Sequence, residues 1–172
     1  MAFGIKSAGL SISVCLAAAV VASTVTRDVQ ADVRCFPVSG KIHSLFTSTN
    51  CTSPVGLCTV GTIVGGDLDG ATSFQALDAA PSAGLPAVEA AANLSYSGSL
   101  TIVAPRGTLT IRDLGVIDAA GLSFTEIERP ASGTGAYASP SGDFFISGAI
   151  TDAGDGFTGA LHGMLCSDRS DR

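Results

Sequence analysis

The chain has 172 residues, of which 46% are hydrophobic and 14% are charged, and its formal net charge is −6. A chain of this length is expected to form a single domain. The excess of acidic residues excludes a general nucleic-acid binder, which would carry a basic patch. Wholesale disorder is also excluded, because charges are few and aliphatic residues are abundant. The 21 glycines complete the description of a small, acidic, glycine-rich globular protein.

A secretory signal peptide is predicted over residues 1–31. Lys6 precedes an uncharged, mostly apolar stretch at 8–22, and small residues follow it, which is the pattern of such leaders. Cleavage is expected after Ala31, where small side chains precede the cut, and cleavage after Ala22 is the alternative. The sequence therefore predicts a secreted, extracellular protein whose single domain is 32–172.

A membrane anchor is the competing interpretation of the same segment. A helix needs about 20 apolar residues to cross a bilayer, and Arg27 and Asp28 interrupt this run. Cys15 is preceded by Val14, where a lipoprotein signal requires a small residue. No later stretch of the sequence approaches spanning length, so we expect no membrane span after cleavage.

Four cysteines remain after the leader: Cys35, Cys51, Cys58 and Cys166. An even number in an exported chain indicates two disulfides, and four cysteines permit three pairings. Cys51 and Cys58 flank the turn-rich segment 52–57, which a local bridge would close. Cys35–Cys166 would then join the two ends of the domain. A metal site is the alternative, but the cysteines form no Cys-x-x-Cys pair, so we expect no metal.

Strand signals dominate the chain after the leader. Leu109, Ile111 and Asp113 alternate with polar residues, which places them on one face of a strand. The segment 79–91 is expected to be a loop. Apolar or β-branched runs between glycine and proline breaks predict strands at 34–46, 57–64, 72–77, 92–103, 108–117, 123–129, 144–151 and 156–165.

Eight short strands with joined ends favour an all-β fold, a closed antiparallel eight-stranded barrel, because closure removes exposed sheet edges. A two-sheet sandwich shares most of these signals and is the alternative. Glycines within strands, which permit bends and close packing, favour the barrel: Gly98, Gly148, Gly159 and Gly163. The interior of such a barrel holds packed side chains or one small ligand.

Two sequence blocks carry a resemblance to a known family. The segment 107–111 reads Gly-Thr-Leu-Thr-Ile, and 132–137 reads Ser-Gly-Thr-Gly-Ala-Tyr, with Gly142 after it. Together they resemble the allene oxide cyclase and dirigent superfamily, whose recurrent stretch is Gly-Gly-Thr-Gly-x-Phe followed by a further glycine. The resemblance covers 106–166 and departs from that stretch by a serine for the first glycine and a tyrosine for the phenylalanine.

The resemblance implies an eight-stranded barrel with an apolar cavity, often assembled as a homodimer or homotrimer. Relatives steer the cyclisation or coupling of reactive small molecules without a cofactor. The chain is also similar to small secreted, cysteine-stapled bacterial members of that superfamily. No catalytic residue of either enzyme type aligns with this chain, so the resemblance assigns no catalytic role.

The glycine block Gly133, Thr134 and Gly135 is predicted to be structural. Glycines on both sides of the threonine allow positive φ angles that other side chains disfavour. A phosphate-binding loop is the functional alternative, but the required lysine and following helix are missing. We therefore expect a tight turn or bulge at this block.

The candidate catalytic acids are inward-facing carboxyl groups. Asp113 shares a strand face with apolar residues, and Glu126 and Glu128 share one with Phe124. Burial raises the pKa of a carboxyl group, which makes it a useful acid near neutral pH. The alternative is that these acids are solvated, with Glu128 and the adjacent Arg129 forming a surface charge pair.

His162 is the third candidate, as a proton shuttle in the last strand. It would face the cavity with Tyr96 or Tyr137, and the alternative is an exposed or hydrogen-bonded histidine. His43 and His162 share no spacing that would predict a metal site.

The sequence thus favours a secreted, cofactor-free barrel that binds an apolar small molecule and directs its cyclisation or stereoselective coupling. Whether the protein is an enzyme is left open. One alternative is a non-catalytic module that sequesters a lipid-like ligand. The other is an extracellular structural or interaction protein whose barrel is filled by its own side chains.

Overall fold

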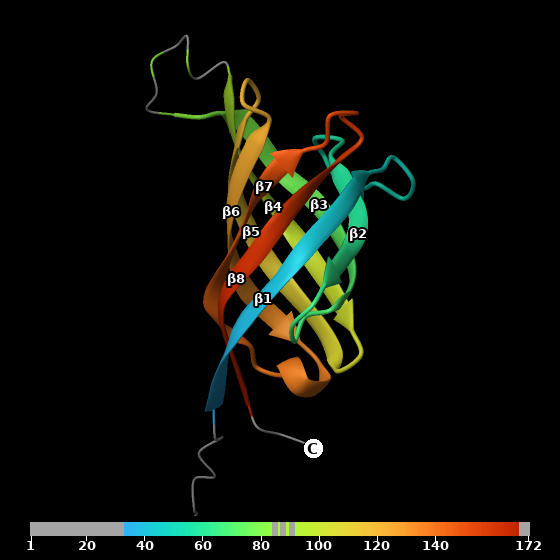
Figure 1. Cartoon of the computed structure of the whole chain (residues 1–172), viewed down its shortest axis with the longest axis vertical. Coiled ribbons are helices and arrows are strands. Elements are labelled where there is room, and N and C mark those ends of the chain that lie inside the picture. Colours follow the sequence, from blue (N-terminus) through green and yellow to red (C-terminus); the bar gives the residue numbers. More distant parts are fainter. Residues whose placement is uncertain (1–32, 84–85, 87–88, 90–91, 169–172) are drawn as a thin grey trace, which may run out of the picture. The chain divides into compact units, whose positions relative to one another are not determined.

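The computed structural model describes residues 33–83, 86, 89 and 92–168 (Figure 1). The predicted signal peptide lies outside the described residues. Within the part of the chain that is described, no helix is long and apolar enough to cross a membrane.

Eight antiparallel strands form a closed barrel in which each strand pairs with the next and β8 pairs with β1 (Figure 1). This confirms the predicted fold class and excludes the two-sheet sandwich. All eight predicted strands are present, with ends that differ by a few residues. Their bounds are β1 (Val33–Phe46), β2 (Cys58–Val64), β3 (Gly70–Pro81), β4 (Asn93–Ala104), β5 (Gly107–Asp118), β6 (Ser123–Gly133), β7 (Ser141–Ile150) and β8 (Gly156–Asp168).

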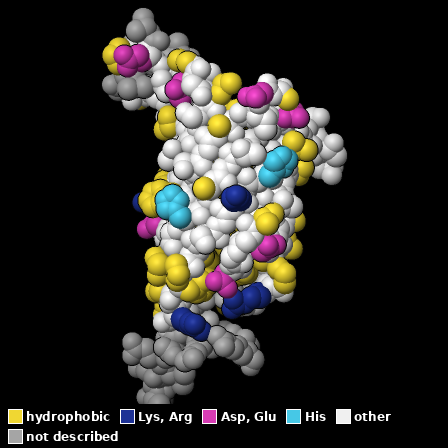
Figure 2. Space-filling model, viewed as in Figure 1, with side chains coloured by type: hydrophobic (Ala, Val, Ile, Leu, Met, Phe, Trp, Pro, Cys, Tyr) yellow, Lys and Arg dark blue, Asp and Glu magenta, His cyan; other side chains and the backbone are white. Residues whose placement is uncertain are grey.

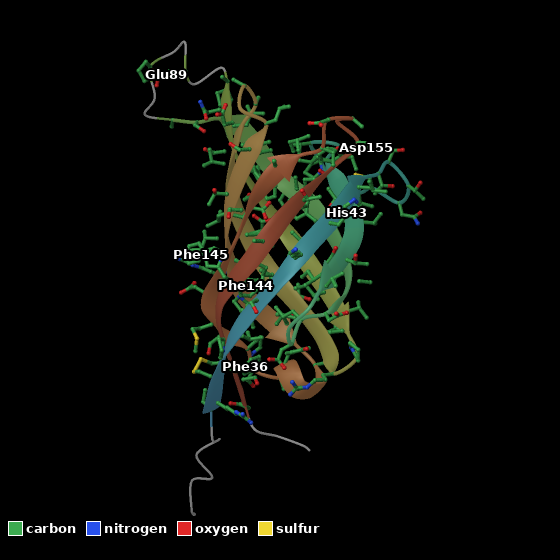
Figure 3. All side chains as sticks on the ribbon, in the orientation of Figure 1. Phe36, His43, Glu89, Phe144, Phe145 and Asp155 are labelled. Carbon is green, nitrogen blue, oxygen red and sulfur yellow. A yellow bond between two sulfur atoms is a disulfide. The ribbon has the colours of Figure 1, made fainter. Side chains whose placement is uncertain are left out.

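Alternation along the strands places the core inside the barrel. On β5, Leu109, Ile111 and Asp113 are buried while the residues between them are more exposed. On β7, Phe144 points into the barrel and Phe145 lies on its outer side (Figure 3). Because side chains alternate between the two faces of a strand, a closed barrel receives every second residue of each strand in its interior.

β3 is longer than its sequence predicts. The predicted strand ends at residue 77, but pairing with β4 continues to Pro81 after a bulge between Ala76 and Asp78. The residues after the bulge lack an apolar alternation, so the sequence alone indicates a loop from residue 79. The prediction is wrong for 79–81, because the neighbouring strand supplies backbone hydrogen bonds whatever the side-chain pattern.

Both predicted disulfides are formed, Cys35–Cys166 and Cys51–Cys58. Cys35 stands directly opposite Cys166 in the register between β1 and β8. The first bridge therefore crosses the seam at which the barrel closes. The second bridge ties the loop between β1 and β2 to the start of β2.

One end of the barrel is closed by the turn between β6 and β7. This turn contains the short 3-10 helix η1 (Gly135–Tyr137), which Gly135 enters with φ +58°. The ring of Tyr137 is fully buried, and its hydroxyl donates a hydrogen bond to the backbone carbonyl of Asp67. A Cβ on Gly133 would collide with the Tyr137 backbone, so the glycine block shapes this end of the barrel.

Candidate functional site

The barrel contains a partly open cavity of about 100 Å³ in the half that lies away from η1. Its lining includes residues from the ends of β1 and β7 and from the starts of β2 and β8. The helix η1 lies at the opposite end of the barrel, because it joins the end of β6 to the start of β7. Most of the wall is aromatic or aliphatic. The interior is therefore not completely filled by side chains. The polar side chains in the lining are Ser44, Thr59, Tyr96, Asp113 and Glu126.

Three buried carboxyl groups gather at the wall of this cavity. Asp113 on β5 stands directly opposite Glu128 on β6, and Glu126 lies two residues earlier on the same face of β6. Their exposed fractions are 2%, 0% and 7%, respectively. One carboxylate oxygen from each residue lies within 4.8 Å of the other two. The strand alternation thus brings three acids together inside an apolar barrel.

Tyr96 reaches this carboxyl cluster from β4 because Gly115 has no side chain. In the strand register Gly115 lies between Tyr96 and Glu126, and a Cβ on it would collide with the tyrosine ring. The Tyr96 hydroxyl donates a hydrogen bond to Glu126 Oε1. Phe74 packs edge-on against Tyr96 with ring centroids 6.1 Å apart. The ring positions at the site therefore depend on a glycine in the neighbouring strand.

Replacing Gly115 by alanine is expected to destabilise the protein by about 1–3 kcal/mol, because the new methyl group must displace the Tyr96 ring in a packed interior. The same displacement breaks the hydrogen bond to Glu126. Chemical denaturation measures the loss. Val116→Ala is the matched control, since Val116 is the next residue on β5 and lies on the outer face. A loss for Gly115→Ala no larger than the control's would contradict the role of Gly115.

Burial raises the pKa values of all three acids above their ordinary values. It raises the pKa of Asp113 to about 9, and the charge of Glu126 adds to this. It raises the pKa of Glu126 to about 7, although the hydrogen bond from Tyr96 acts in the opposite direction. The pKa of Glu128 is raised well above its ordinary value by burial and by the two neighbouring acids. At neutral pH Asp113 therefore holds its proton, and Glu126 is close to its midpoint.

Two buried oxygens at the site have no partner among the described residues: Oδ1 of Asp113 and Oγ of Ser44. The carboxyl group of Glu128 instead shares a hydrogen bond with that of Glu126. Leaving a buried polar group unsatisfied costs about 1–3 kcal/mol. Such groups are expected where a protein binds something that supplies the missing hydrogen bonds.

The structure brings two of the three predicted site residues into the cavity. Asp113 and Glu126 both line it. The alternative of a surface pair between Glu128 and Arg129 is wrong, since Glu128 is fully buried and Arg129 pairs with Asp143 on the outer face at 3.2 Å. Glu128 lies on the same strand face as Phe124, and this sequence pattern predicted its inward direction correctly.

His162 does not share the cavity, which corrects the expectation that it would face inward. Leu161 occupies the inward position on β8, so the next residue points outward. The imidazole stacks on Phe145 with ring centroids 5.9 Å apart. Figure 2 shows histidine side chains on the outer surface of the barrel. The titratable side chains that line the cavity are therefore Tyr96, Asp113 and Glu126.

Sequence reasoning grouped Tyr96 with His162, and it missed the contact between Tyr96 and Glu126. The sequence feature that could have indicated this contact is Gly115, a glycine in the middle of a strongly alternating strand. A glycine at such a position often marks a place where another group approaches closely.

No protein-family model, no curated protein and no solved structure matches the chain. The protein is therefore described by its fold and its candidate site. It is a disulfide-linked, closed eight-stranded antiparallel barrel with an apolar interior cavity and a buried carboxyl cluster in its wall.

Proposed function

We propose that this protein is a secreted barrel that binds a small, largely apolar molecule in its interior and directs the cyclisation or coupling of that molecule. One observation carries the proposal. Asp113 and Glu126 line the same apolar cavity, and their pKa values are raised to about 9 and about 7. A concave, apolar site with a few converging polar groups is the usual form of a small-molecule site.

The two acids suit a reaction that moves protons without a cofactor. Pairs of titratable groups whose surroundings push their pKa values apart supply an acid and a base at one pH. Asp113, protonated at neutral pH, donates its proton to an oxygen of the ligand. Ionised Glu126, held by Tyr96, accepts a proton from a neighbouring C–H or O–H bond of the same molecule. One proton is given and one is taken, so the reaction is an isomerisation such as ring closure.

The cavity volume limits the occupant. An engineered apolar cavity of about 150 Å³ binds benzene, and the cavity here measures about 100 Å³. The buried part of the ligand is therefore no larger than a single small ring or a short branched chain. The rings of Phe74, Phe124 and Phe157 provide a wall that suits such a group.

Secretion and family membership belong to the same proposal. Two disulfides are typical of proteins from oxidising compartments. The resemblance to the allene oxide cyclase and dirigent superfamily supports both chemistry inside the barrel and assembly into a homodimer or homotrimer. The resemblance alone does not assign the function, because one fold hosts many functions.

Native mass spectrometry of protein purified from its host tests the proposal. Wild-type protein is expected to carry a bound small molecule, and Leu100→Trp is expected to lose it, because the larger side chain fills the cavity. Val103→Trp is the matched control, since Val103 lies on the outer face of the same strand and is 56% exposed. If wild-type protein carries no molecule and binds no neutral apolar probe, the filled-barrel structural protein replaces this proposal.

A non-catalytic sequestering module is the second candidate, favoured by the largely apolar wall of the cavity. It predicts that the bound molecule is recovered unchanged after prolonged incubation. It also predicts that Asp113→Asn has no effect on the fate of that molecule. Conversion of the molecule by wild-type protein but not by this variant would exclude sequestration alone.

A further inference from the structure

The carboxyl cluster formed by Asp113, Glu126 and Glu128 has no cationic partner within the described part of the chain. Both ion pairs found there, Arg106–Asp67 and Arg129–Asp143, are exposed. No lysine, arginine or histidine lines the cavity. The barrel thus isolates three acids from every described base.

The placement of the nearest arginines shows how the fold maintains this separation. Arg112 and Arg129 are the neighbours of Asp113 and Glu128 along β5 and β6, and they stand opposite each other in the strand register. Both are exposed on the outer face, because alternation sends adjacent residues to opposite sides of the barrel wall. The missing positive charge must therefore come from protons or from a ligand.

The unpartnered oxygens indicate which kind of ligand would complete the site. Oδ1 of Asp113 and Oγ of Ser44 lack partners among the described residues, and both side chains are at most 2% exposed. A ligand made only of hydrocarbon would leave them unsatisfied. An ammonium group brings three N–H donors and a positive charge, and hydrogen bonds between ionised partners are about twice as strong as neutral ones.

The walls of the cavity favour an organic cation over a bare metal ion. A hard cation such as Ca²⁺ takes six to eight oxygen ligands, whereas most of the lining beside the acids is aromatic or aliphatic. Aromatic faces attract ammonium groups, and Tyr96, Phe74 and Phe124 all border the cavity. The same walls accommodate a short hydrocarbon body.

We propose that the ligand of this barrel is a small primary amine, bound as its ammonium ion beside Asp113, Glu126 and Glu128 with its hydrocarbon body against Phe74 and Leu100. This inference rests on the proposed function, because it names the ligand of the same cavity. It adds a chemical class that the resemblance does not imply.

Amine binding has a pH dependence with a defined sign. The groups that face Glu126 are Tyr96 from β4, Asp113 from β5 and Glu128 on its own strand, while Ile146 on β7 carries no charge. The cation must displace the proton of Glu126, whose pKa is raised by burial to about 7, while Asp113 keeps its own proton. Binding therefore strengthens as pH rises, by about tenfold per pH unit for each proton released.

Isothermal titration calorimetry with a charged and a neutral probe of equal size tests this inference. Isopentylamine is compared with isopentyl alcohol at about pH 6 and about pH 8. The amine is expected to bind about tenfold or more tightly than the alcohol at the higher pH, with proton release, and its advantage shrinks at the lower pH. The alcohol is expected to show no such pH dependence.

Variants locate the effect in the carboxyl cluster. Glu126→Gln is expected to remove the preference for the amine. Asp143→Asn, which removes an exposed carboxyl on the outer face, keeps it. If Glu126→Gln does not fold, Asp113→Asn and the pH profile of the wild-type protein give the same test.

The outcomes separate this inference from the proposed function. If the alcohol binds as tightly as the amine or more tightly, the proposal of an amine ligand is overturned and the proposed function is unaffected. Binding of neither probe overturns the amine, and it overturns the proposed function as well if protein purified from its host carries no bound molecule. Binding of Ca²⁺ or Mn²⁺ that is lost in Asp113→Asn, without any binding of the amine, overturns the amine proposal in favour of a metal site.

Discussion

Replacing Cys35 and Cys166 together by alanine is expected to lower the free energy of unfolding by about 4–5 kcal/mol. The bridge spans 131 residues, so its loss frees almost the whole domain in the unfolded state. The bridged residues also face each other across the β1–β8 seam, where the two ends of the chain must meet to close the barrel. Chemical denaturation of the double variant measures the loss.

The other disulfide provides the matched control. Cys51 and Cys58 are only 7 residues apart, so removing their bridge is expected to cost less than about 3 kcal/mol. Equal losses for the two double variants would contradict the argument from loop length. They would indicate that local strain or packing dominates both bridges.

Replacing Glu128 by glutamine is expected to stabilise the protein at about pH 8 and to have little effect near pH 4. The side chain is fully buried, and among the described residues no lysine or arginine pairs with it. Burial and the neighbouring acids raise the pKa of Glu128 in the folded protein. Glutamine has a similar size and removes the ionisable group.

The sign of the pH dependence follows from the raised pKa values. An acid whose pKa is higher in the folded state contributes stability that is fully present below its unfolded pKa, about 4. This contribution is lost as the pH rises towards the folded pKa, which is about 7 for Glu126 and about 9 for Asp113. The wild-type protein should therefore lose stability between about pH 4 and pH 9, and Glu128→Gln should lose less.

Denaturation curves at several pH values check this expectation. Near pH 4 the wild-type protein and Glu128→Gln should differ little, because Glu128 is then largely protonated in both the folded and the unfolded state. Asp143→Asn, at an exposed ion pair, should change stability by less than about 0.5 kcal/mol at any pH. Destabilisation by Glu128→Gln near pH 8 would show that the carboxylate has a partner that stabilises it.

The carboxyl cluster lowers the stability of the fold, and this indicates that the cluster has a function. A barrel selected only for stability would place apolar residues at these three inward positions, since a buried acid without a partner destabilises the fold. Strongly perturbed acids that share a cavity are typical of functional sites. Sites at which a sequence breaks the rules of packing are the sites at which function is expected.

The local sequence pattern was sufficient to predict most of the fold. Alternation and glycine or proline breaks marked all eight strands, and the parity of Asp113 with Leu109 and of Glu126 with Phe124 gave their inward direction. The even number of cysteines and the short spacing of Cys51 and Cys58 led to the correct disulfides. These features were accessible because the two-residue period of a strand and the closure of a short loop involve only neighbouring residues.

The chain by itself therefore determined the strands, the barrel class, the disulfides and the inward-facing acids. Only the tertiary structure decided that the three acids meet at one site, that Tyr96 reaches Glu126 across Gly115 and that His162 lies outside. The reason is physical. Alternation tells which residues share a face, whereas the register between strands and the closure of β8 onto β1 decide which faces form the interior and which side chains meet there.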